Sequence, residues 1–120
     1  MKKIIASFQY AFRGIADLIR TERHGRFHAV AAIVVITAGL LLHLSACEWI
    51  AVILCISLVA SLEAMNTAIE HLTNLVSPDY HPLAGRAKDV AAGAVLLAAT
   101  GAAAVGLIIF LPKVLALTWN

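Results

Sequence analysis

Charged residues are scarce in this sequence. Asp, Glu, Lys and Arg make up 13% of the 120 residues, whereas 62% are hydrophobic and the mean hydropathy is +0.91. A soluble domain carries about twice that share of charge, so the composition excludes an ordinary soluble protein and predicts an integral membrane protein. The net charge of +2 suits contact with anionic lipid and is too weak to favour a nucleic-acid partner.

Cysteines are few, and nucleotide-binding signatures are missing. Cys47 and Cys55 would lie roughly 12 Å apart on a helix, too far for a disulfide, so we expect both to be small apolar packing residues. The sequence has no Gly-x-x-x-x-Gly-Lys-Ser/Thr loop, no protein-kinase signature and no four-residue zinc set. Any nucleotide site must therefore be built in another way. Because no repeat or low-complexity linker divides the chain, residues 1–120 are expected to form a single domain.

Three hydrophobic stretches are long enough to cross a membrane. They cover residues 27–44, 49–75 and 90–111, and the last is expected to end at Pro112. Each has roughly the 17–25 residues that a helix needs to cross the hydrocarbon core. The predicted fold is therefore an all-α membrane protein. Three such helices leave too little interior for a large water-excluded active site, so we expect the chain to oligomerise.

Residues 1–25 precede the first span and have the pattern of an amphipathic helix. Their charged residues fall mostly away from the apolar side. This pattern predicts a surface helix that lies along the membrane interface. A helix packed on the protein's own surface is the alternative. The apolar residues that recur at helical spacing are Ile4, Ile5, Phe8, Phe12, Ile15, Leu18 and Ile19.

Basic residues are distributed unevenly along the chain. Six of the nine Lys and Arg residues precede the first span, and Arg86 and Lys88 lie between the second and third spans. The turn between the first two spans has none, and the C-terminal tail has only Lys113. Because positive charge favours the cytoplasmic side, we expect the N-terminus and the second loop to be cytoplasmic.

The second span contains the most informative motif, a set of polar residues inside a hydrophobic helix. Glu63, Asn66 and Glu70 fall within roughly 60° of one another on a helix that turns about 100° per residue. An acid at membrane depth costs about 2.5–3.5 kcal/mol and usually marks a functional site. Carboxylates on one face can hold a divalent metal ion or share acid–base work. The alternative is that these residues only bond a neighbouring helix.

Depth places this motif close to the cytoplasmic interface. Counted from the outer end of the second span at 1.5 Å per residue, Glu63 lies roughly 21 Å deep and Glu70 roughly 31 Å deep. Glu22 precedes the first span on the same side, and Lys88 and Asp89 open the third span there. The sequence therefore predicts one polar layer at the cytoplasmic side of the membrane.

Phosphoryl transfer at a membrane surface fits the chemistry of this layer. Glu22 and Glu70 are candidate ligands for Mg²⁺, which prefers oxygen ligands and substrate phosphates. Lys88 is suited to binding phosphate charge, and the deeper Glu63 is suited to taking a proton from a lipid hydroxyl. Asn66 could orient either group.

Other interpretations of the polar residues carry less weight. Placement at the membrane interface explains most of the five histidines, among which His81 is the strongest site candidate. The alternative function is a small proton-coupled multidrug-type transporter, which would also carry a membrane glutamate. Transporter sites lie near the midplane, whereas this layer is skewed toward the cytoplasm. A purely structural protein is disfavoured by the cost of burying Glu63.

Together these motifs resemble the small prokaryotic diacylglycerol kinases and the related undecaprenol kinases. The resemblance runs from about Lys3 to Phe110 and implies a homotrimer in the bacterial inner membrane, with a surface helix and three membrane helices per chain. It also implies ATP- and Mg²⁺-dependent phosphorylation of a lipid alcohol at the cytoplasmic face. The residues that carry it are Glu22 with Arg26, Glu63-x-x-Asn66-Thr67-Ala68-Ile69-Glu70, Asp79-Tyr80-His81, Gly85-Arg86-Ala87-Lys88-Asp89 and Ala94-Val95-Leu96.

The resemblance also implies roles for single residues. Glu63 matches the catalytic base and Asn66 a residue that organises the site, while Glu22 and Glu70 match the metal ligands. The matches to nucleotide-binding residues are Lys88, Asp89, Asp79, Tyr80, His81, Glu22 and Glu70 and, more loosely, Lys3 and Tyr10.

The sequence departs from the family pattern at one position, and its motifs bear on which lipid is the substrate. Asn74 stands where many members have an acid. Glu48-Trp49 and residues 91–97 look more like the undecaprenol kinase branch, whereas Tyr80-His81 and residues 85–89 also suit the diacylglycerol kinase branch. The resemblance therefore favours undecaprenol slightly over diacylglycerol as the lipid substrate.

Overall fold

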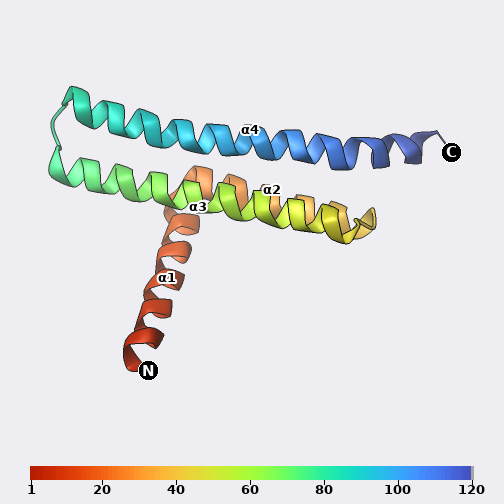
Figure 1. The fold of residues 1–120 in the computed structure, drawn as a ribbon. Helices are drawn as coiled ribbons and strands as arrows, with labels where there is room; N and C mark the ends of the chain where they lie inside the picture. Colours follow the sequence, from red (N-terminus) through yellow and green to blue (C-terminus); the bar gives the residue numbers. More distant parts are fainter. Residues whose placement is uncertain (120) are drawn as a thin grey trace.

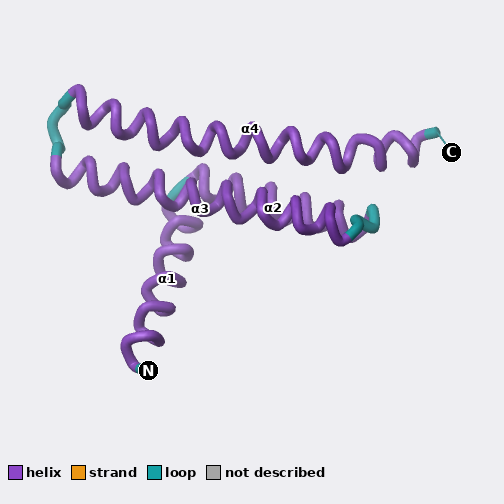
Figure 2. The backbone as a smooth tube through the Cα atoms, viewed as in Figure 1, coloured by secondary structure: helices purple, strands orange, loops and turns teal. Residues whose placement is uncertain are grey.

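The computed structural model describes residues 1–119, in which the regular structure consists of four helices and no strand. The helices are α1 (Lys2–Thr21), α2 (Arg23–Leu41), α3 (Ala46–Val76) and α4 (Pro82–Thr118). Short connections join them (Figure 2). By length and composition, α2, α3 and α4 can each cross a membrane. The predicted fold class, a membrane protein with one amphipathic helix and three membrane helices, is confirmed.

The helix ends differ from the predicted spans. The surface helix ends at Thr21 rather than at residue 25, because Glu22 is extended, with φ −102° and ψ 123°. The first span begins at Arg23 and ends at Leu41, instead of covering 27–44. The other two helices extend beyond 49–75 and 90–111 at both ends. Hydropathy locates the apolar part of a helix, whereas its ends depend on capping.

The helix does not stop at Pro112, where the third span was expected to end, because this residue lies inside α4. A proline removes one backbone hydrogen bond and bends a helix, but membrane helices tolerate it when neighbouring groups compensate. Directly after it, the Lys113 Nζ atom lies 3.1 Å from the Glu48 Oε2 atom of α3. This ion pair ties the C-terminal end of α4 to the start of α3.

The connection between α2 and α3 is specified by local chemistry. His43 has φ 52°, the left-handed conformation that commonly terminates a helix. The Leu44 N–H donates to the Gly39 carbonyl at 3.3 Å, which closes this C-terminal cap. The Ser45 hydroxyl then accepts from the Glu48 N–H at 3.2 Å and starts α3. Together, the two caps fix the turn after which α3 runs back in the direction opposite to α2.

Helices α3 and α4 form the most extensive contact in the chain and run side by side (Figure 1). Ala91 and Ala98 of α4 are buried, and α3 is the helix that covers them, because among the described residues α4 contacts no other helix. Small residues let two helices approach closely in lipid, where packing drives association. The alanine-rich pattern of α4 is thus explained in part by packing within the chain.

Helix α1 projects away from the other three helices (Figure 1). None of its residues is buried, and Phe8 and Phe12 are 63% and 68% exposed. Within residues 1–119, most of the apolar face of α1 is therefore not covered by the protein's own helices, which does not support the alternative of a helix packed on the protein's own surface. At its base, a Cβ atom on Gly25 would lie 2.9 Å from the Leu18 carbonyl oxygen, so this glycine permits the close junction of α1 and α2. A membrane surface is the apolar phase that suits the exposed face of α1.

Candidate functional site

The predicted polar motif lies on the face of α3 that the chain covers best. Glu63 is 4% exposed and Thr67, one turn further along, is 8% exposed. Asn66 and Glu70 on the same face are half-buried. Spacings of three, four and seven residues bring these side chains onto one side of a helix. The burial pattern therefore agrees with the predicted common face.

A histidine from the next helix lies beside Glu63. The His28 Nε2 atom of α2 is 3.5 Å from the Glu63 Oε2 atom, and the two side chains are 19% and 6% exposed. The sequence interpretation missed this residue, because it explained the histidine by its interfacial position. His28 is the second residue of the predicted span and follows His24, Gly25 and Arg26, so its sequence position gave no signal of a contact with another helix.

An apolar groove of about 450 Å³ opens beside this pair. All four helices contribute to its wall, and α2 and α4, which do not contact each other within residues 1–119, form opposite sides. Phe27, Val59 and Ala102 are typical of the lining. Glu63 supplies the one carboxylate and His28 the one imidazole of this wall, as far as the structure describes it. An alkyl or prenyl chain matches such a surface.

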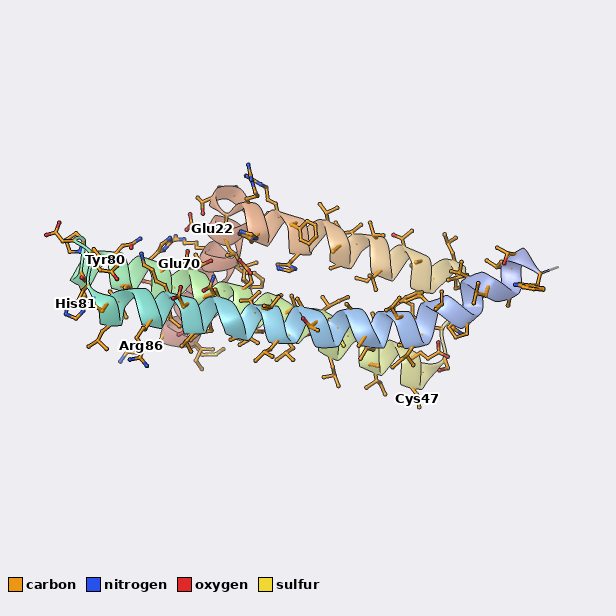
Figure 3. The ribbon with its side chains drawn as sticks, turned by 90° about the horizontal axis from the view of Figure 1, so that it is seen from above. Glu22, Cys47, Glu70, Tyr80, His81 and Arg86 are labelled. Atoms are coloured by element: carbon orange, nitrogen blue, oxygen red, sulfur yellow. The ribbon has the colours of Figure 1, made fainter. Side chains whose placement is uncertain are left out.

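The two predicted metal ligands approach the same level of α3. The Glu22 Oε1 atom lies 3.8 Å from the Nε2 atom of His71, the residue after Glu70. Figure 3 shows Glu22 and Glu70 in the same region of the molecule, with Cys47 at the opposite end. Among residues 1–119, no group of three or more His, Cys, Asp or Glu side chains could hold a metal ion. A pair of carboxylates that shares an ion with substrate phosphates is the arrangement typical of Mg²⁺ in kinases.

Asn66 carries an acceptor without a partner in the described chain. Its Oδ1 atom is buried and accepts no hydrogen bond. Most buried polar atoms have a partner, so an unpaired one calls for an explanation. Its place on α3 between Glu63 and Glu70 makes it available to a substrate group. The predicted organising role of Asn66 is compatible with this geometry.

The amino-terminal part of α4 adds a basic residue to the layer. The Lys88 Nζ atom donates a hydrogen bond to the Asn74 Oδ1 atom of α3. Asn74 therefore offers an oxygen acceptor to this lysine. Asp89 is exposed next to it. This hydrogen bond links α4 to α3 near the turn that joins the two helices.

The turn between α3 and α4, with Tyr80 and His81, lies at one end of the molecule, beyond Glu70 and Glu22 (Figure 3). The Ser77 hydroxyl donates to the Asp79 carbonyl at 2.9 Å, and Tyr80 is 90% exposed. The His81 Nδ1 atom accepts from the Leu83 N–H at 3.1 Å and caps α4. His81 thus has a structural role in starting this helix, and its Nε2 atom is the one left for a ligand.

The predicted nucleotide contacts on α1 are not brought to this layer within one chain. Lys3 lies in the first turn of α1, at the end that projects away from the other helices (Figure 1). The Tyr10 ring lies 5.9 Å from the Arg13 guanidinium, on the same helix. In the described part of the chain, no hydrogen bond or ion pair joins the side chain of either residue to α3 or α4.

Comparison with known proteins identifies similar membrane kinases. The family model described as prokaryotic diacylglycerol kinase matches residues 9–110. An undecaprenol kinase of Bacillus subtilis is 48% identical over 113 residues, which cover 94% of this chain and 92% of that protein. A diacylglycerol kinase of Synechocystis is 45% identical over 115 residues, covering 95% and 66%. A diacylglycerol kinase of Escherichia coli K12 is 31% identical over 96 residues, covering 80% and 79%.

Proposed function

Because the chain belongs to the prokaryotic diacylglycerol kinase family and is a membrane lipid kinase, we propose that it transfers the γ-phosphate of ATP to the hydroxyl of a membrane lipid alcohol. The observation that carries this proposal is the buried Glu63 carboxylate on the wall of an apolar groove. A groove of this kind accepts the lipid, and the carboxylate accepts the hydroxyl proton. Family membership also disfavours the transporter alternative.

The proposed chemistry is a single displacement. The lipid oxygen forms a bond to the γ-phosphorus, and the bond from that phosphorus to the β–γ bridging oxygen breaks. Glu63 takes the proton from the lipid hydroxyl as the new bond forms. The products are the lipid phosphate and ADP, and the proton on Glu63 leaves before the next turnover. Asn66, with its free Oδ1 atom, helps to orient the reacting groups.

Glu22 and Glu70 are the residues that would hold Mg²⁺, which when bound neutralises phosphate charge. Their carboxylate oxygens are hard ligands of the kind this ion prefers. Lys88 and Asp89 extend the layer toward the turn, where Asp79, Tyr80 and His81 are exposed to a soluble nucleotide. We assign these five residues to ATP binding.

The proposed orientation follows from the basic residues and from depth. The N-terminus, the turn between α3 and α4 and the ATP layer face the cytoplasm of a bacterial inner membrane. Glu63 lies on α3 about two turns below Glu70, toward the membrane interior. A lipid can then enter the groove sideways from the bilayer and keep its long tail in the apolar phase.

Glu63→Gln is expected to lower kcat by roughly 10²–10⁴-fold, because the amide keeps the shape of the side chain but cannot accept the hydroxyl proton. Phosphate transfer from labelled ATP to lipid in mixed micelles measures this loss. Glu48→Gln is the matched control, since Glu48 lies at the opposite end of α3 and pairs with Lys113. If Glu63→Gln turns over at the control rate, Glu63 is not the base.

Glu22→Ala and Glu70→Ala are each expected to raise the Mg²⁺ concentration needed for half-maximal activity, roughly tenfold or more. Each substitution removes one oxygen ligand from an ion that bridges the protein and the phosphates. Activity is titrated with Mg²⁺ at saturating ATP, with Asp17→Ala on the exposed part of α1 as the control. An unchanged Mg²⁺ dependence in both variants would show that the ion binds elsewhere.

Undecaprenol is the proposed preferred substrate, with diacylglycerol also accepted. The 48% identity to an undecaprenol kinase supports this order, although a diacylglycerol kinase follows at 45%. Competition between the two lipids in one bilayer, with the labelled products separated by chromatography, measures the preference. We expect both products and a moderate excess of undecaprenyl phosphate. Exclusive labelling of diacylglycerol would reverse the assignment of substrate and leave the kinase assignment intact.

A homotrimer is the proposed assembly. One chain leaves the groove beside Glu63 open, and it leaves Lys3 and Tyr10 on a helix that points away from the ATP layer. A neighbouring copy can close the groove and bring its own α1 to the site. Light scattering with correction for bound detergent is expected to give the mass of three chains. An active monomer would contradict this assembly.

Because Ala98 is buried within the chain, Ala98→Leu would report on packing of α3 and α4 rather than on assembly.

A further inference from the structure

The carboxylate of Glu63 requires a partner from another part of the protein. Its side chain is 6% exposed and lies in a helix long and apolar enough to cross a membrane. A buried charge or polar group is costly unless another group bonds to it. In the described chain, the one ionisable side chain from another helix within ion-pair distance of Glu63 is His28.

His28 is held in a defined place on the wall of the groove. It lies on α2, and its ring packs edge-on against Phe27, with the ring centroids 5.5 Å apart and an interplanar angle of 76°. Its Nε2 atom faces one oxygen of Glu63, the Oε2 atom, at 3.5 Å. Among residues 1–119, no other residue forms an ion pair with Glu63. The two carboxylate oxygens are therefore in different environments.

We infer that His28 is a positioning residue, which holds Glu63 Oε2 through its Nε2–H group and leaves Oε1 directed at the lipid hydroxyl. This inference rests on the proposed role of Glu63 as the base. A freely rotating carboxylate would sample many orientations, and a misplacement of about 1 Å can cost roughly 100-fold in rate. Hydrogen bonds at active sites are often long without substrate and shorten in the working complex, which is consistent with the 3.5 Å separation.

Two substitutions separate this role from simple packing. His28→Phe keeps an aromatic ring and its edge contact with Phe27 but removes the N–H donor. His28→Gln loses the ring and keeps an amide N–H at about the reach of Nε2. The matched control is His24→Phe, because His24 is exposed one turn earlier on α2. All variants are purified as the full chain and assayed with undecaprenol or diacylglycerol in mixed micelles, with kcat and the KM for ATP determined separately.

We expect His28→Phe to lower kcat by roughly 10- to 100-fold, with little change in the KM for ATP. His28→Gln should recover a large part of the loss, and His24→Phe should match the parent protein. Thermal unfolding in detergent is measured for each variant, and the ratio of kcat values is compared at a temperature where all are folded. If His28→Phe retains the parent kcat, or if the Gln and Phe variants lose it equally, the positioning role is wrong.

Glu63→Gln is assayed in the same experiment, so that two kinds of failure can be told apart. If Glu63→Gln is inactive while His28→Phe is fully active, the base assignment stands and the role of His28 is excluded. If Glu63→Gln retains activity, the base assignment fails and the inference about His28 fails with it.

Discussion

Burial of the Glu63 carboxylate is the constraint on which the site depends. A charged or polar side chain in a membrane helix is stable only when another group bonds to it or when water reaches it. Here α2 provides His28 at 3.5 Å, and the rest of the surrounding wall is apolar. The path of α2 beside α3 is therefore tied to the chemistry as well as to packing. At Gly39, an added Cβ would lie 2.8 Å from the Trp49 ring of α3, so this glycine lets α2 make that path.

The existence and order of the helices could be predicted from the sequence, because apolar runs of membrane length and the amphipathic pattern before them depend on composition alone. The helix ends could not. His43 adopts a left-handed conformation although it is not glycine, and Pro112 lies within α4 although proline usually ends a helix. Both features depend on neighbours, such as the Leu44–Gly39 hydrogen bond and the Lys113–Glu48 ion pair, which hydropathy does not contain.

The candidate site could be predicted only where its residues share one helix. Glu63, Asn66 and Glu70 follow from the helical repeat, and their burial on one face agrees with it. His28 could not be assigned, because its contact with Glu63 depends on how two helices pack. Within a single chain, the first turn of α1 with Lys3 points away from the layer. A role for α1 in nucleotide binding therefore needs a contact that one chain does not make.

The proposed reaction would bring together a water-soluble and a membrane-bound substrate, and the fold offers them places at different depths. As the proposed phosphate donor, ATP stays in water, so its proposed ligands belong on the turn and at the adjoining ends of α3 and α4, where charged side chains are exposed. A lipid alcohol stays in the bilayer, so its path belongs in the apolar groove between α2 and α4. ATP and the lipid alcohol can meet only at the boundary between water and the bilayer core. A proton acceptor there must be deep enough to reach the lipid hydroxyl. It must also lie close to the residues proposed to bind ATP and Mg²⁺. Glu63, one heptad before Glu70 on a continuous helix, satisfies both conditions because an α-helix advances about 10 Å in seven residues and returns to the same face.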